Sequence, residues 1–97
     1  MDLVLADFEH LVGKSFDVPA EEAGEVFTQL ILCEVSRLPH GHPARLEPFS
    51  LIFEGSRGCA LEQGTYWLIQ PALGERAIFL VPLGDQGEMR RYQAIFN

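Results

Sequence analysis

The stretch Phe49-Ser50-Leu51-Ile52-Phe53-Glu54 places a large apolar side chain at every second position, beginning with its first residue. Successive side chains of a β-strand point to opposite faces of the sheet, so this spacing predicts a strand. Its odd-numbered residues share one face, which we expect to line a core, while Ile52 lies on the other face. The glycine-containing stretch at residues 55–58 is expected to end the strand.

The same alternation recurs toward the C-terminus. Strands are predicted at residues 65–70, 77–83 and 91–96. Between them, residues 71–74 and 84–87 contain the proline, glycine and aspartate that are typical of turns. Short turns join strands that are neighbours in the sheet, so these three strands are expected to form an antiparallel meander.

The N-terminal half contains two further strand candidates. Residues 15–18 form a short one that Pro19 closes, and residues 26–38 form a long one with many β-branched and aromatic side chains. The long run alternates imperfectly, so either both of its faces are covered or a bulge shifts the register near Cys33. A helix over the same residues is the competing interpretation. Pro82 likewise predicts an edge position or a bulge that ends its strand.

A helix signal occurs close to the N-terminus. Asp7 is placed to cap a helix, and Gly13 is placed to end it. Three apolar residues at helical spacing lie between them, namely Phe8, Leu11 and Val12. A helix of about two turns is marginal in water by itself, so it must pack against the sheet.

These elements add up to a mainly β fold, with about six mostly antiparallel strands in a small barrel-like or sandwich sheet and a short N-terminal helix. The chain has 97 residues, of which 47% are apolar, so a single β-rich domain over residues 1–97 is expected. The aromatic side chains at strand positions are assigned to its core: Phe49, Phe53, Tyr66, Phe79, Tyr92 and Phe96.

Net charge limits the classes of partner. Seven basic and fourteen acidic residues give a formal charge of −7, and Arg90-Arg91 is the only adjacent basic pair. Nucleic-acid binding requires clustered lysine and arginine, and an anionic membrane surface repels an acidic chain, so neither partner is expected. The sequence has no run of ~18 apolar residues and no secretion signal at its N-terminus, which predicts a cytoplasmic protein.

Residues that carry chemistry are few. His40 and His42 lie one residue apart in a loop with proline and glycine, and they are weak metal candidates because no convincing second pair of ligands accompanies them. Cys33 and Cys59 lack Cys-x-x-Cys spacing and are expected as free thiols, although a disulfide between them stays open. No nucleophile, acid–base pair or phosphate loop has its usual sequence context, so neither enzymatic activity nor a cofactor is expected.

Several apolar residues fall on the strand faces opposite the expected core. They are Ile52, Trp67, Ile69 and Ile95. Contiguous apolar surface that stays exposed marks an interaction site, so these four residues are candidate contacts for a protein partner or for self-association. The alternative is a two-layer fold in which the helix covers them.

The C-terminal half also carries a family-like pattern, in residues 48–55, 63–66, 71–74, 79–82 and 92–97. Together with residues 7–13, these segments resemble a small uncharacterised bacterial single-domain family, some of whose members are encoded near phage tail-collar-like proteins. The resemblance spans nearly the whole chain. Because its motifs consist of turn and core residues, it implies a fold and no catalytic residues.

The expected function is therefore a non-enzymatic protein-interaction or assembly module of unknown partner, to which the resemblance adds an association with a phage-tail-like structure. The alternative is a small-molecule-binding protein or enzyme. Its site would lie at the barrel mouth near His40, His42 and Arg57, where polar side chains could converge.

Overall fold

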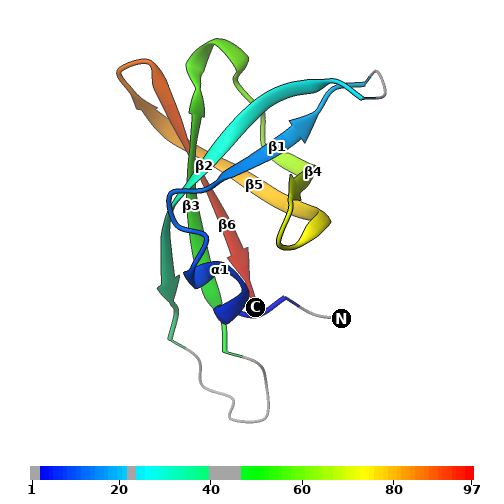
Figure 1. The fold of residues 1–97 in the computed structure, drawn as a ribbon. Coiled ribbons are helices and arrows are strands. Elements are labelled where there is room, and N and C mark those ends of the chain that lie inside the picture. Colours follow the sequence, from blue (N-terminus) through cyan, green and yellow to red (C-terminus); the bar gives the residue numbers. More distant parts are fainter. Residues whose placement is uncertain (1–2, 22–23, 40–46) are drawn as a thin grey trace.

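A computed structural model describes residues 3–21, 24–39 and 47–97, whose chain forms a closed barrel of six antiparallel strands (Figure 1). The order of strands around the barrel is β1-β2-β3-β6-β5-β4, and β4 pairs with β1 to close it. The elements are α1 (Ala6–Glu9), β1 (Ser15–Pro19), β2 (Val26–Arg37), β3 (Phe49–Ser56), the 3₁₀ turn η1 (Arg57–Cys59), β4 (Gly64–Gln70), β5 (Gly74–Gln86) and β6 (Met89–Phe96). The predicted mainly β barrel with a short N-terminal helix is confirmed, and the C-terminal strands form the predicted meander.

Strand β3 occupies the position that its alternation predicts, between β2 and β6. Phe49, Leu51 and Phe53 all point inward, and the most exposed of them has only 2% of its surface in contact with solvent. Every strand contributes such inward residues, and together they fill the interior. The buried apolar core comprises Phe8, Leu11, Phe16, Val18, Leu30, Leu32, Phe49, Leu51, Phe53, Leu61, Leu68, Ile78, Leu80, Tyr92 and Ala94.

Two long strands bend so that six strands can close on themselves. β2 pairs with β1 through its first half and with β3 through its second half, and β5 divides in the same way between β4 and β6. Each carries a register shift, between Leu32 and Glu34 in β2 and between Pro82 and Gly84 in β5. A bulge inserts a residue into one strand and bends it there. The bulge predicted near Cys33 is confirmed, which removes the helical alternative.

The bulge in β5 does not end its strand, as Pro82 was predicted to do. Pro82 lies at the register shift, but β5 continues to Gln86 rather than ending. The reversal of the chain is therefore a tight hairpin at residues 87–88. Gly84 has a φ of +137° and belongs to the bulge, where a residue without a Cβ adopts that backbone conformation at least cost.

Helix α1 is a single turn and is shorter than the sequence pattern predicts. Leu5 occupies the N-cap, and the Asp7 carboxylate instead accepts a hydrogen bond from the backbone N–H of Val4 at 2.8 Å. The helix ends at Glu9, so the apolar stripe is kept only in part: Leu11 is buried at 4% exposure, whereas Val12 is 48% exposed. Asp7 as the helix cap was a wrong prediction, and so was Val12 as part of the apolar stripe of a two-turn helix.

The short helix packs at the end of the barrel where β6 ends (Figure 1). Its Phe8 ring lies 5.8 Å from the ring of Phe49 and 5.7 Å from the ring of Phe96, measured between ring centroids. A helix of one turn cannot form alone, so this aromatic contact supplies its stability. None of the helices in the described residues is long and apolar enough to cross a membrane.

Candidate functional site

Apolar side chains cover part of the outside of the barrel. We call this surface the outer apolar face and define it by five residues on four strands: Ile52, Trp67, Ile69, Phe79 and Ile95. Trp67, Phe79 and Ile95 are 55%, 50% and 53% exposed, whereas Ile52 and Ile69 are half-buried. All four residues that the sequence suggested for an interface therefore lie outside the core.

Strands β4 and β5 carry the aromatic part of this face. Trp67 pairs with Ala77, and Thr65 pairs with Phe79, so the two aromatic residues are diagonal neighbours across the strands. Diagonal residues on one face of a sheet are about 7–8 Å apart, within reach of large side chains. The small side chain of Ala77 leaves Trp67 uncovered on that side.

Strands β3 and β6 carry the aliphatic part. Ile95 pairs with Ser50, and Ile52 pairs with Gln93, which makes the two isoleucines diagonal neighbours on the outside. The sequence prediction therefore combined two groups of residues: Trp67 and Ile69 on β4, to one side of β5, and Ile52 and Ile95 on β3 and β6, to its other side. Phe79, on β5, belongs to the same outer face.

Phe79 is the residue of this face that the sequence reasoning assigned wrongly, because it expected a core position. Ile78 and Leu80 point inward at 2% and 0% exposure, so Phe79 between them must point outward. Both faces of this part of β5 carry apolar residues, and alternation alone could not decide which face was inside. Tyr66, also expected in the core, is only half-buried.

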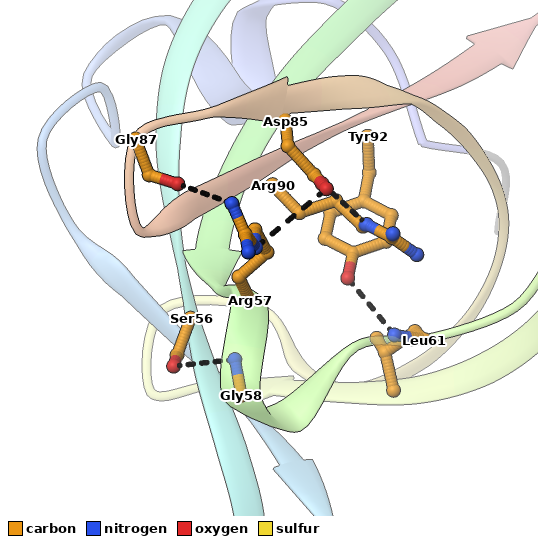
Figure 2. Close-up of polar contacts among 8 residues, drawn as sticks. All are labelled: Ser56, Arg57, Gly58, Leu61, Asp85, Gly87, Arg90 and Tyr92. Atoms are coloured by element: carbon orange, nitrogen blue, oxygen red, sulfur yellow. Dashed lines mark hydrogen bonds and ion pairs between the residues drawn. The ribbon is translucent and has the colours of Figure 1, made fainter.

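A second candidate site is a cluster of polar side chains at one barrel mouth, around the hairpin between β5 and β6 (Figure 2). Arg90 donates a hydrogen bond from Nε to Asp85 Oδ1 at 2.7 Å. Arg57, which follows β3, places its Nε 3.7 Å from the other oxygen of Asp85 and donates from Nη1 to the backbone oxygen of Gly87 at 3.0 Å. The two guanidinium groups therefore hold one carboxylate between them.

This arrangement shifts the proton affinity of the groups that it joins. The hydrogen bond from Arg90 and the positive charges of Arg90 and Arg57 hold the pKa of Asp85 below its ordinary value. The same hydrogen bond raises the pKa of Arg90. Arg57, predicted to serve a ligand at this mouth, is thus bonded to the β5–β6 hairpin, while His40 and His42 lie outside the described residues.

The two cysteines are free thiols in separate places. Cys33 is the residue that the β2 register shift skips, and its Sγ donates to the backbone oxygen of Ile31 at 3.4 Å. Burial raises the pKa of the Cys33 thiol, and the charge of nearby Glu54 raises it further. Cys59 lies at the end of η1. Over residues 3–21, 24–39 and 47–97, no three His, Cys, Asp or Glu side chains gather as metal ligands.

These features define a class of protein, namely a small closed β-barrel with a filled interior and an apolar outer face. The chain belongs to the family described as Domain of unknown function (DUF6916), which matches residues 3–96. The expected resemblance to an uncharacterised family along nearly the whole chain is confirmed in that form. Neither a curated protein nor a solved structure matches the chain.

Proposed function

We propose that this chain is a non-enzymatic protein-interaction module that binds a partner through its outer apolar face. The observation that supports the proposal is the pair Trp67 and Phe79, which are diagonal neighbours on adjacent strands, each with half or more of its surface exposed. Single exposed apolar residues are ordinary, but adjacent large aromatic residues are enriched at interfaces because they bury much area on binding.

The filled interior supports the same conclusion. Leu68, Ile78 and Leu80 are the inward residues of these two strands and already supply their part of the core. Trp67 and Phe79 point outward and are not members of the buried core, and polar residues at these positions would favour solubility. Their contact area is therefore available to another molecule.

Charge favours a different protein over a second copy of this chain. The formal charge of −7 makes two copies repel each other, and the apolar face is bordered by carboxylates at one end. Asp17 on β1 and Glu75 on β5 are the register partners of Ile69 on its two sides. Positive charges in a partner would be attracted to that border.

The experiment is affinity capture with crosslinking from the organism that encodes the chain, using the wild type, the double variant Trp67→Ala and Phe79→Ala, and the control variant Leu83→Ala. Leu83 is also exposed, at 52%, but lies at the β5 bulge. The proposal expects a defined protein to be captured by the wild type and the control and lost by the double variant. Capture of the same proteins by all three chains contradicts it. Light scattering on the purified chain tests self-association.

The association with a phage-tail-like structure stays a prediction from the family resemblance. It expects the captured partner to be a structural protein of such a particle, and an unrelated partner would contradict it. A small-molecule site near Arg57 is not proposed, since that guanidinium is occupied by Asp85 and Gly87.

A further inference from the structure

The seam between β1 and β4 is closed at one end and open at the other. Asp17 and Ile69 form the register pair that joins the two strands, and Gln70 reinforces that end by donating from Nε2 to the backbone oxygen of Ser15 at 3.4 Å. Within the described residues, no second register pair extends the seam. In the other direction β1 ends at Pro19, which has no N–H to donate toward β4.

The edge of β4 beyond this point therefore lacks a strand partner among the described residues. It comprises residues 64–68, which pair with β5 on their other side. An unpaired strand edge offers backbone donors and acceptors in a regular row, and extended peptides bind to such edges by adding a strand.

An apolar groove lies where the two strands separate. Its volume is about 450 Å³, and it runs between the end of β1 on one side and Tyr66 with the preceding loop on the other. Val18 and Leu61 line it and are 3% and 5% exposed, so they form its floor. Phe27 also lines it and is 48% exposed, at the position that the β1–β2 register shift skips.

The wall of the groove is held by two tyrosine hydroxyl groups. Inside the barrel, the backbone N–H of Leu61 donates to the hydroxyl of Tyr92 at 2.9 Å (Figure 2). On the outside, the hydroxyl of Tyr66 donates to the backbone oxygen of Glu62 at 2.7 Å. A wall that is already fixed lowers the entropic cost of binding a peptide against it.

The charged residues that line the groove are both acidic. Glu21 follows β1 and Glu62 precedes β4, so a carboxylate stands on each side of the apolar floor. No lysine or arginine is among the described lining residues, and the whole chain carries −7. A segment with positive charges therefore complements this groove, whereas a second copy of the chain is repelled.

We propose that the groove binds an extended segment of a partner protein, which pairs with the free edge of β4, inserts a large apolar side chain beside Phe27, and places lysine or arginine near Glu21 and Glu62. The proposal rests on the function proposed above, since it names a class of partner for an interaction module. It uses a surface separate from Phe79, which lies on the opposite side of β4.

The test is titration of the full chain with a synthetic peptide of alternating lysine and valine, followed by NMR. The amides of residues 64–68 are expected to shift, and those of every second residue, whose N–H points away from β5, are expected to gain protection from hydrogen exchange. Two control peptides separate the contributions: one replaces lysine by glutamate, and the other keeps the side chains but carries N-methyl groups along one backbone edge. Each is expected to bind at least about tenfold more weakly.

Variants of the protein test where the peptide binds. The single variants Phe27→Ala and Glu62→Lys are each expected to weaken binding about tenfold, while Phe79→Ala is expected to bind as the wild type does. Equal binding of the N-methylated peptide, or shifts confined to the surface around Phe79, would overturn the proposal, as would self-association through residues 64–68. If the peptide binds as expected but no partner depends on Trp67 and Phe79, the outer-face proposal fails alone.

Discussion

The hydroxyl oxygen of Tyr92 lies 2.9 Å from the backbone nitrogen of Leu61 and accepts its hydrogen bond inside the barrel. The bond joins the middle of β6 to the loop between η1 and β4, across 31 positions of sequence. Tyr92 is fully buried and Leu61 is 5% exposed, so water does not replace the bond. One side chain thus fills the core and fixes a loop at its edge.

Removing this hydroxyl should destabilise the fold. Tyr92→Phe keeps the ring but leaves the Leu61 N–H buried without a partner, which costs about 1–3 kcal/mol. Urea unfolding measures the loss, and hydrogen exchange at the Leu61 amide should become faster. Tyr66→Phe is the matched control, because its hydroxyl donates to Glu62 in an exposed position. Equal losses in the two variants would contradict this account.

Gly55 on β3 is required by a close approach. A Cβ at this position would stand 2.5 Å from Cδ2 of Leu30, whose side chain is fully buried and has little room to move. Gly55→Ala is therefore expected to cost about 1–3 kcal/mol of unfolding free energy through overpacking. At Gly58 the nearest atom would be 3.5 Å away, so Gly58→Ala is the control and should change stability little. Thermal unfolding of both variants checks the difference.

The strands could be predicted from sequence wherever only one face is apolar. In β3 and β6 the alternation identified the inward residues, Tyr92 and Ala94 among them, because their neighbours Arg91 and Gln93 are polar. The bulge at Cys33 could also be located, because the alternation of apolar residues breaks there. In the structure Leu32 before it and Val35 after it both pack on the core, although they have opposite parity in the sequence. Inserting one residue exchanges the two faces, which explains the broken alternation.

Positions that depend on distant contacts could not be predicted in this way. Phe79 lies in a segment that is apolar on both faces, and only its pairing with β4 and β6 decides which face is inside. The seam groove depends on where β1 stops relative to β4, which no local pattern encodes. Helix α1 is held by aromatic rings from β3 and β6, and these contacts are not encoded in its local helical spacing.

The one-turn helix gives a prediction about the end of the barrel. Phe8→Ala removes a ring that is fully buried against Phe49 and Phe96, and such a truncation costs about 3–5 kcal/mol. Val12→Ala, at a position that is 48% exposed, should cost far less. Unfolding in urea compares the two variants. Similar losses would mean that α1 does not stabilise the barrel.

Cys33 should react slowly with thiol reagents at neutral pH. The thiolate is the reactive form, and burial together with the charge of Glu54 raises the pKa of this thiol above its ordinary value of 9.0. Its rate of alkylation, followed by mass spectrometry in the variant Cys59→Ser, should keep rising with pH beyond the point where glutathione levels off. Glu54→Gln should lower the pKa and speed the reaction. A rate equal to that of glutathione at every pH would contradict the raised pKa.

The ion cluster at the barrel mouth predicts a pH dependence with a definite sign. Arg90 and Arg57 hold the pKa of Asp85 below its ordinary value of 3.8, so the folded state favours the charged carboxylate. The resulting stabilisation is present above that value and is lost as pH falls through the lower pKa of the folded protein. Asp85→Asn removes the titrating group, so its melting temperature should fall less than that of the wild type between pH 7 and about pH 2. Because the cluster is exposed, salt should reduce the difference between the two chains. An equal fall of melting temperature in the wild type and in Asp85→Asn would assign the effect to another carboxylate.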